Sequence, residues 1–326
     1  MKILVTGRFF PEVINHLEEF AEVIAYKGYA PVPRRKLLKL ARGVDGILSL
    51  LPTMIDGEVM DRSPNLKVIA NDAVGYDNID VAAATARGIF VTNTPGVLTE
   101  TTADLTWALV LAIGRRVVEG DRILRSGGWK LAWDPNFMLS GDVHGKTLGV
   151  FGMGRIGTAV AKRAMGFGMR IIYNSRSPKP EVERDLNAKF VSFQELLKEA
   201  DLVVVTVPLN AQTRHIIGRK ELALMKKTAY LINTARGAVI EEKALVQALR
   251  RKRIAGAGLD VFENEPIGPK HPLTKLDNVV LTPHVGSATI ETRKAMAMLA
   301  TENLIMALEG NTPKNLVNPE ALATRK

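Results

Sequence analysis

Polar residues of three types with complementary chemistry follow apolar segments in the second half of this 326-residue chain: Arg236, His284, and a carboxylate in the segment 261–266, which contains both Glu263 and Glu265. A histidinium can donate a proton to a developing alkoxide, because the ordinary pKa of histidine, about 6.5, lies near working pH. A carboxylate hydrogen-bonded to the other ring nitrogen would hold the tautomer and raise that pKa. An arginine can bind a substrate carboxylate and polarise its carbonyl group. The three residue types therefore suit hydride transfer to a 2-oxo acid.

A dinucleotide fingerprint, which could bind the hydride donor, lies earlier in the chain. Three glycines with the spacing GxGxxG follow an apolar run over residues 148–151 and precede an amphipathic stretch over residues 156–167. The first glycine allows a tight turn, the second lets the backbone approach a pyrophosphate, and the third lets the helix pack on the strand. The helix N-terminus then offers free N–H groups to the phosphates. The residues assigned to the cofactor here are Gly152, Gly154, Arg155, Ile156 and Gly157.

The segment after the fingerprint lacks the acidic residue that binds the ribose of NAD in most such domains. No Asp or Glu occurs between Gly152 and Glu181. Arg176 is open to two interpretations, as a cofactor ligand or as an ordinary surface arginine after a strand. The residues that follow the expected second strand are Asn174, Ser175, Arg176 and Ser177.

The amino-acid composition excludes several kinds of site and of protein. The absence of cysteine excludes disulfides, thiolate catalysis and Cys-ligated zinc, and no HExxH or clustered-carboxylate pattern indicates a metal. The longest apolar run, residues 105–113, is half the length of a membrane span of about 18 residues. The N-terminus lacks the apolar core of a secretory leader, so we expect a cytoplasmic protein that does not bind membranes.

The formal net charge of +10 invites comparison with nucleic-acid-binding proteins. The basic clusters, however, lie in helix-like segments without the interleaved aromatic residues of single-strand binders. We therefore expect no nucleic-acid partner, and we interpret the clusters as solvated helix faces or as a general attraction for anionic substrates. The clusters are residues 34–36, 115–116 and 250–253.

The elements that must position the chemistry alternate between strand and helix patterns, which indicates parallel sheets covered by helices. We predict an α/β fold with two doubly wound parallel-sheet domains of the Rossmann or flavodoxin-like kind. In such sheets ligands bind beyond the carboxyl ends of the strands. Strands are expected over residues 2–6, 22–26, 44–51, 66–71, 89–93, 148–151, 170–173, 189–191, 202–207, 229–233, 255–260 and 279–281. Helices are expected over residues 11–20, 34–42, 80–87, 101–119 and 289–309, of which 101–119 is apolar almost all round and predicts a helix buried between domains.

Five blocks in this order resemble the D-isomer-specific 2-hydroxyacid dehydrogenases from about residue 40 to residue 317: AVGYDNIDV (73–81), VFGMGRIG (150–157), INTARGAVI (232–240), GLDVFENEP (258–266) and LTPHVGSAT (281–289). The resemblance implies that Arg236, Glu265 and His284 are catalytic. It also implies that the backbone of Val74 and Gly75 binds the substrate carboxylate. Leu51, at the end of an expected strand, is a further candidate substrate contact. The additional cofactor residues so implied are Thr102, Val207, Pro208, Thr234, Ala235, Asp260, which should meet the nicotinamide amide, His284 and Gly286.

The same family inserts its cofactor domain into its substrate domain. The resemblance therefore implies a substrate domain of residues 1–98 plus 290–326 and a cofactor domain of residues 99–289. It further implies a homodimer that forms through the cofactor domain.

Within the family, the chain looks most similar to the glyoxylate/hydroxypyruvate reductases. These enzymes tend to replace the acidic ribose ligand with a small polar residue followed by arginine, as Ser175 and Arg176 do here. Arg176 can pair with a 2′-phosphate that an acid would repel, so we expect NADP(H) to be preferred over NAD(H). Residues 127–141 resemble a Trp-bearing segment of the reductases, and Trp133 is the candidate that could reach a partner's active site.

Two other classes of function stay open at this point. The same scaffold supports oxidation of 3-phosphoglycerate, D-lactate or phosphite. A dinucleotide-sensing transcriptional corepressor would also retain the arginine, glutamate and histidine, although the sequence has no long tails of the kind that carry peptide motifs. The leading hypothesis is reduction of glyoxylate or hydroxypyruvate to a 2-hydroxy acid, the D-isomer where the product is chiral.

Overall fold

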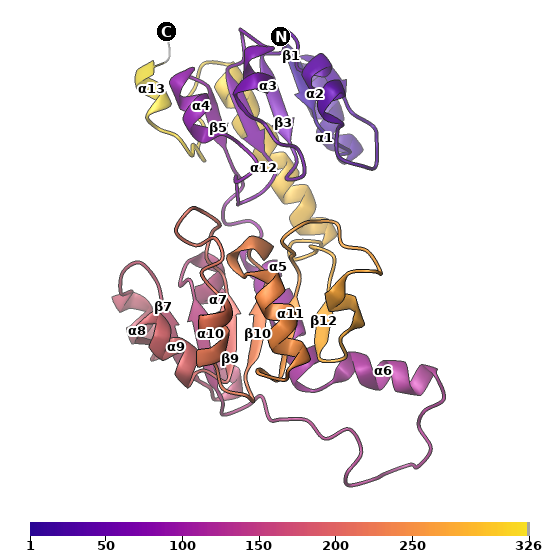
Figure 1. The fold of residues 1–326 in the computed structure, drawn as a ribbon. Helices are drawn as coiled ribbons and strands as arrows, with labels where there is room; N and C mark the ends of the chain where they lie inside the picture. The colour runs from indigo at the N-terminus through magenta and orange to yellow at the C-terminus, as the bar shows by residue number, and fades with distance from the viewer. Residues whose placement is uncertain (325–326) are drawn as a thin grey trace. The chain divides into compact units, whose positions relative to one another are not determined.

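The computed structural model describes residues 1–324 and divides into two compact α/β units (Figure 1). Unit 1 contains Met1–Leu98 and the chain from Ala288 onward, and unit 2 contains Thr99–Ser287. Each unit is built around one sheet whose strands all pair in parallel. The predicted fold class, two parallel-sheet α/β domains, is confirmed.

Unit 1 has a five-stranded sheet in the order β2-β1-β3-β4-β5, the flavodoxin-like order. The buried residues of α1 and α12 pack on one face of this sheet, and those of α2, α3 and α4 pack on the other. The strands are β1 (Lys2–Val5), β2 (Glu22–Ala25), β3 (Gly46–Ser49), β4 (Val68–Asn71) and β5 (Phe90–Thr92), and the helices are α1 (Pro11–Phe20), α2 (Arg34–Leu40), α3 (Gly57–Asp61), α4 (Val81–Ala86), α12 (Ile290–Leu308) and α13 (Ala321–Thr324).

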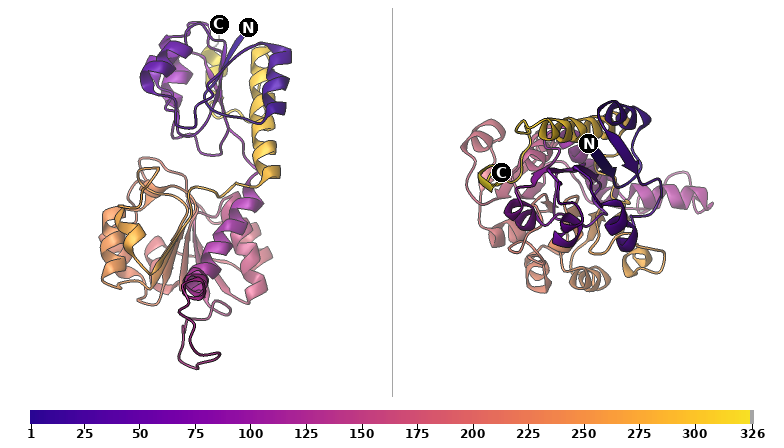
Figure 2. Two further views of the ribbon diagram at one scale, coloured as in Figure 1. Left: turned by 90° about the vertical axis from the view of Figure 1, so that its right-hand side faces the viewer. Right: turned by 90° about the horizontal axis from the view of Figure 1, so that it is seen from above.

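Unit 2 has a seven-stranded sheet in the order β12-β11-β10-β9-β6-β7-β8. Counted from β6, this is the doubly wound 3-2-1-4-5-6 order of dinucleotide-binding domains with one further strand. Helices cover both faces of the sheet, as Figure 2 shows. The strands are β6 (Thr147–Phe151), β7 (Arg170–Asn174), β8 (Lys189–Phe190), β9 (Leu202–Val205), β10 (Tyr230–Asn233), β11 (Gly256–Leu259) and β12 (Val279–Leu281). The helices are α5 (Thr99–Gly114), α6 (Val117–Arg125), α7 (Arg155–Ala164), α8 (Pro180–Leu186), α9 (Phe193–Glu199), α10 (Arg219–Leu224) and α11 (Glu242–Arg250), with short 3₁₀ segments η1 (Met165–Phe167), η2 (Gly237–Val239) and η3 (Pro272–Lys275).

The single helix predicted over residues 101–119 is wrong, because the chain forms two helices there. Arg116 adopts a left-handed backbone conformation with φ 53°, which ends α5 and begins α6. Its guanidinium is held by Glu119, with 2.6 Å between Nη2 and Oε1. The apolar surface of α5 packs on α7, β10 and β11 of its own unit. Packing within unit 2 therefore accounts for a helix that is apolar almost all round.

Most of the other predicted elements are confirmed with small changes of length. The helix over 11–20 and the strand over 279–281 have the predicted bounds, whereas the strands predicted to residues 207 and 260 end at Val205 and Leu259. The sequence interpretation missed α3, whose first turn is capped by the Asp56 carboxylate accepting a hydrogen bond from the Val59 N–H. No helix within residues 1–324 is both long and apolar enough to cross a membrane.

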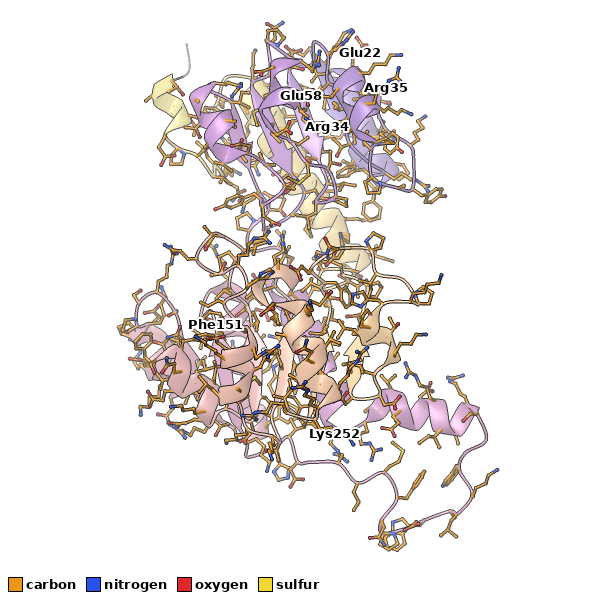
Figure 3. The ribbon with its side chains drawn as sticks, viewed as in Figure 1. Glu22, Arg34, Arg35, Glu58, Phe151 and Lys252 are labelled. Carbon is orange, nitrogen blue, oxygen red and sulfur yellow. The ribbon has the colours of Figure 1, made fainter. Side chains whose placement is uncertain are left out.

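The basic cluster at residues 34–36 lies on α2 of unit 1, where Figure 3 labels Arg34, Arg35 and Glu58. The Arg34 guanidinium forms ion pairs with Asp56, at 2.8 Å, and with Glu58. Part of this positive charge is thus neutralised within the unit.

Candidate active site

Gly152 and Gly154 lie in the turn between β6, which ends at Phe151 (labelled in Figure 3), and α7, and Gly157 is the third residue of α7. Gly152 has φ 109°, and a Cβ there would lie 2.8 Å from the backbone of Val207. A Cβ on Gly157 would lie 2.2 Å from the Gly152 carbonyl oxygen, so only glycine lets the helix approach the strand this closely. Gly154, by contrast, is exposed and has nothing near the position of a Cβ. This turn leaves its backbone open to a ligand.

The turn lies between the carboxyl ends of β6 and β9, which are neighbours in the sheet although they are far apart in sequence. This is the point where the strand order reverses, and dinucleotides bind there in doubly wound sheets. The first residue of α7, Arg155, is exposed, and the unpaired N–H groups of the first helical turn point toward the same edge. Val207 is buried in the loop after β9, and Pro208 follows it on the surface.

The segment after β7 has the polar character that the sequence predicts. The Asn174 side-chain amide donates to the Val191 carbonyl at 2.8 Å, and the Gly152 N–H donates to the Asn174 carbonyl at 2.9 Å. The Ser175 hydroxyl donates to the Ser177 carbonyl at 2.6 Å. Arg176 is exposed and forms no hydrogen bond or ion pair with any residue between 1 and 324. Asn174 therefore holds the loop, while the Arg176 guanidinium is available to a ligand.

His284 and Glu265 form the closest acid–base pair of the predicted set. His284 Nδ1 lies 2.7 Å from Glu265 Oε2, and both side chains are about one-third exposed, at 32% and 33%. The other oxygen of Glu265, Oε1, accepts a hydrogen bond from the Phe262 N–H at 2.9 Å. Because Nδ1 faces a carboxylate, we assign it the proton, which leaves Nε2 as the nitrogen that can exchange a proton with a substrate.

The electrostatics of this pair favour an ionised Glu265. Burial acts to raise the pKa of Glu265, but the hydrogen bond and charge of His284, the Phe262 N–H and the charge of Arg236 together lower it. The Glu265 carboxylate therefore stays ionised at lower pH than an ordinary glutamate does. A negative Glu265 accepts the hydrogen bond from His284 Nδ1 and so fixes the tautomer and orientation of the imidazole ring.

Asp260 holds the turn that presents His284. His284 has a left-handed backbone with φ 53°, and its N–H donates to the Asp260 carbonyl at 2.8 Å. Asp260 is 1% exposed, and its carboxylate accepts from the Thr282 hydroxyl at 2.6 Å and from the N–H groups of Val285 and Gly286, each at 2.8 Å. Burial raises the pKa of Asp260, against the effect of these donors and of His284. The expected contact of Asp260 with a nicotinamide amide stays a prediction.

Arg236 reaches the same edge from the loop after β10. The Asn233 side chain braces this loop, since its amide donates to the Arg236 carbonyl at 2.9 Å and its oxygen accepts from the Ala235 N–H at 3.0 Å. A Cβ on Gly237 would lie 1.8 Å from the Phe262 carbonyl carbon, so only glycine allows the loop of Arg236 to touch the loop of Glu265. The sequence interpretation missed Asn233, although a polar residue at the last position of a buried strand is a usable signal.

The remaining predicted cofactor residues of unit 2 lie around the same strand ends. The Thr234 hydroxyl lies 2.8 Å from the Thr106 hydroxyl, which links the loop after β10 to α5. Thr102 of α5 is 5% exposed and lies under Gly286, with 3.4 Å between its methyl carbon and the position of a Gly286 Cβ. Within the described chain, no group of three or more His, Cys, Asp or Glu could hold a metal ion.

In unit 1, Val74 and Gly75 form a loop after β4 whose carbonyl groups are held by asparagines. The Asn71 amide donates to the Gly75 carbonyl and the Asn93 amide to the Val74 carbonyl, each at 2.8 Å. Asn71 is in turn paired with Asn78 through two amide hydrogen bonds of 3.1 and 3.2 Å. The N–H groups of Val74 and Gly75 donate to no residue in the described part of this unit. The loop therefore has two oriented donors, and the sequence interpretation missed the asparagines that orient them.

Leu51 and Asp72 lie just after the carboxyl ends of β3 and β4 of unit 1. Leu51 is half-buried and follows β3 by two residues. Asp72 is 7% exposed, and burial raises its pKa from 3.8 to about 7, against the attraction of the Arg293 charge. The Asp72 side chain lies buried next to the loop of Val74.

Comparison with known proteins places these features in a family. Residues 107–286 match the model of the D-isomer specific 2-hydroxyacid dehydrogenase, NAD binding domain. The chain is 54% identical to a glyoxylate reductase of Pyrococcus horikoshii over 329 residues, and 51% identical to a glyoxylate reductase of Aeropyrum pernix over 328 residues; each alignment covers 100% of this chain and 98% of the relative.

A solved structure shares the fold. The NADPH-dependent glyoxylate/hydroxypyruvate reductase of Sinorhizobium meliloti, in complex with NADP and malonate, is 37% identical with a TM-score of 0.86, and the match covers 98% of this chain and 97% of that one.

Proposed function

Since the chain belongs to the D-isomer specific 2-hydroxyacid dehydrogenase family and is an NAD(P)-dependent oxidoreductase, we propose that it reduces glyoxylate and hydroxypyruvate with NADPH in preference to NADH. The observation that carries this proposal is the 2.7 Å contact between Glu265 and His284 at the edge of unit 2 that also carries Arg236 and the glycine turn. The glyoxylate reductases that cover the whole chain at about half identity support the substrate class.

The residues present fit a dinucleotide. A pyrophosphate needs backbone N–H groups that it can approach closely. The first turn of α7 supplies them, and Gly154, directly before it, adds no Cβ that would obstruct the approach. When bound, the reduced nicotinamide supplies the hydride that adds to the substrate carbonyl carbon. Thr102, Val207, Thr234, Ala235, Asp260 and Gly286 would surround the nicotinamide half of the cofactor.

The chain's own residues supply the proton and the binding of the anionic substrate. His284 Nε2 donates a proton to the carbonyl oxygen as negative charge develops there, and the 2-oxo acid becomes a 2-hydroxy acid. Glu265 holds the proton on Nδ1 and stabilises the imidazolium before transfer. The Arg236 guanidinium binds the substrate carboxylate and polarises the carbonyl. We propose that the N–H groups of Val74 and Gly75 also bind this carboxylate, and that Leu51 contacts the substrate.

The preference for NADPH rests on the segment after β7. Arg176 is exposed and offers its guanidinium, and the exposed Ser177 hydroxyl can donate to phosphate oxygens, whereas the Ser175 hydroxyl donates to the Ser177 carbonyl. An acid at this position would bind ribose hydroxyls and repel a 2′-phosphate. The reductase of Sinorhizobium meliloti, which resembles this chain over nearly its full length, is described as NADPH-dependent and as bound to NADP.

We propose further that two copies of the chain associate through unit 2. The segment after α6 extends away from the sheet before it returns to β6 (Figure 1). This segment and α6 expose large apolar side chains, and a patch of this kind marks an association surface. The exposed residues are Val117, Leu124, Trp129, Leu131, Trp133, Phe137 and Leu139, of which Trp133 is 77% exposed. Sedimentation velocity should give a dimer for the wild type and a weakened dimer for Trp133→Ala; a monomeric wild type contradicts this proposal.

The test of the function is the oxidation of reduced cofactor, followed as loss of absorbance at the nicotinamide band, with a panel of oxo acids. Glyoxylate and hydroxypyruvate should be reduced with higher kcat/KM than pyruvate and phosphohydroxypyruvate. NADPH should give higher kcat/KM than NADH. Preferential turnover of pyruvate or phosphohydroxypyruvate would identify a different 2-hydroxyacid dehydrogenase, and no turnover of any of the four would contradict the proposal.

A further inference from the structure

A second carboxylate lies behind the loop that carries Glu265. Glu242, the first residue of α11, accepts a hydrogen bond through Oε2 from the Glu263 N–H at 3.2 Å. The positive end of the α11 dipole favours a carboxylate at this position. Glu263 stands between Phe262, whose N–H binds Glu265, and Glu265 itself. Glu242 therefore holds the backbone at the centre of the loop.

His271 fixes the other oxygen of Glu242. Its Nε2 lies 3.0 Å from Glu242 Oε1, and its Nδ1 accepts from the Leu273 N–H. Because Nδ1 is an acceptor, we assign the proton to Nε2, which donates to the carboxylate. The two side chains are only 20% and 17% exposed. Both carboxylate oxygens of Glu242 thus accept hydrogen bonds in a mostly buried place.

The loop is also held on its other sides. The close approach of Gly237 to Phe262 fixes it against the loop of Arg236. The Glu263 side chain pairs with His215, with 2.6 Å between Oε1 and Nε2. Two carboxylates accept from backbone N–H groups of this loop: Glu265 itself, from Phe262, and Glu242, which reaches the Glu263 N–H from outside the loop.

We infer that Glu242, oriented by His271, is a positioning residue that sets the Phe262–Glu265 loop so that the Glu265 carboxylate meets His284. The inference rests on the proposed function of Glu265 and His284. A loop displaced at Glu263 carries Glu265 away from His284 Nδ1, and proton donation then weakens. Arg236 and the glycine turn stay in place, so binding of the oxo acid and of NADPH is unchanged.

The test is Glu242→Gln in two backgrounds. Glutamine keeps the shape of glutamate but turns one oxygen into an NH₂ donor, which must face either the His271 Nε2–H or the Glu263 N–H. With full-length protein, NADPH and glyoxylate, the substitution should lower kcat by about tenfold and leave KM and the NADPH dissociation constant within about twofold. In Glu265→Gln protein, the same substitution should lower kcat by less than about twofold, because there is no catalytic carboxylate left to position.

Glu241→Gln is the matched control. Glu241 is the adjacent residue of the same type and forms no capping hydrogen bond, so its substitution should leave kcat within about twofold of the wild type. Equal losses from Glu242→Gln in both backgrounds would show a merely structural role and would overturn the inference, as would an unchanged kcat. An inactive wild type would instead contradict the proposed function.

His271 provides a second pair of variants should Glu242→Gln fold poorly. His271→Gln can still donate to Glu242 through its amide, whereas His271→Leu cannot. The glutamine variant should keep several-fold more of the wild-type kcat than the leucine variant, with equal NADPH binding. Equal kcat values for the two would overturn the inference.

Discussion

Replacement of Asp72 by asparagine should stabilise the protein at alkaline pH. Burial raises the pKa of Asp72 to about 7 in the folded protein, whereas an aspartate in an unfolded chain has a pKa of about 3.9. The folded state therefore binds this proton more tightly than the unfolded state does. The stabilisation that the neutral Asp72 side chain contributes is fully present below about pH 4. It is lost as the pH rises through about 7, the pKa of Asp72 in the folded protein.

The size of the expected stabilisation follows from the difference between the pKa of Asp72 in the folded and in the unfolded protein. A difference of about 3 pKa units at 1.36 kcal/mol each corresponds to about 4 kcal/mol, as an upper bound on the cost of the ionised carboxylate. Its Oδ1 is buried and accepts no hydrogen bond from the described residues, so little besides the Arg293 charge offsets the lost hydration. The asparagine side chain of the variant cannot ionise, and the substitution therefore removes this cost.

The assay is the free energy of unfolding in guanidinium chloride, measured from about pH 4 to about pH 9. The Asp72→Asn variant and the wild type should have similar stability near pH 4, and the variant should become more stable as pH rises, by up to about 4 kcal/mol above pH 8. Glu18→Gln, which neutralises an exposed carboxylate of α1, is the control and should give a nearly flat difference. A pH-independent difference for Asp72→Asn, or a wild type that gains on the variant at high pH, would refute the reasoning.

Three further predictions concern the active site. Arg176→Ala should raise the dissociation constant of NADPH by about 10- to 100-fold and that of NADH by less than about twofold, as measured by fluorescence titration; equal losses would show that Arg176 does not bind the 2′-phosphate. Glu265→Gln should lower kcat by about 100-fold while NADPH binding persists, and a KM effect alone would place Glu265 in binding. Asn93→Ala frees the Val74 carbonyl and should raise KM for glyoxylate by about tenfold, with the NADPH dissociation constant as the control that stays constant.

The sequence could predict that the candidate catalytic residues lie close together, because the carboxyl ends of parallel strands lie at the same edge of a sheet. Arg236, Glu265 and His284 each follow a buried apolar run, and the structure places them after the adjacent strands β10, β11 and β12. The GxGxxG spacing predicted the turn between β6 and α7 because it lies between a strand pattern and a helix pattern in the sequence. These inferences need only strand order and local periodicity.

The details of pairing depend on contacts between distant parts of the chain. Glu263 and Glu265 have the same chemistry, and only the folded loop shows that the first meets His215 and the second meets His284. The partner of His271, Glu242, is 29 residues away in sequence. Gly114, the last residue of α5, was a usable signal for the break before α6 that the sequence interpretation did not use; the left-handed backbone itself lies two residues later, at Arg116. Asp56 before α3 was a usable cap signal that the sequence interpretation did not use.

The most direct test of the account is the reduction of glyoxylate by NADPH in His284→Gln protein, with NADPH binding measured on the same sample. If His284 is the proton donor, kcat should fall by at least about 100-fold while the NADPH dissociation constant stays within about twofold of the wild type. Near-normal turnover by this variant would remove His284 from the mechanism and contradict the assignment of Arg236, Glu265 and His284 as the catalytic residues.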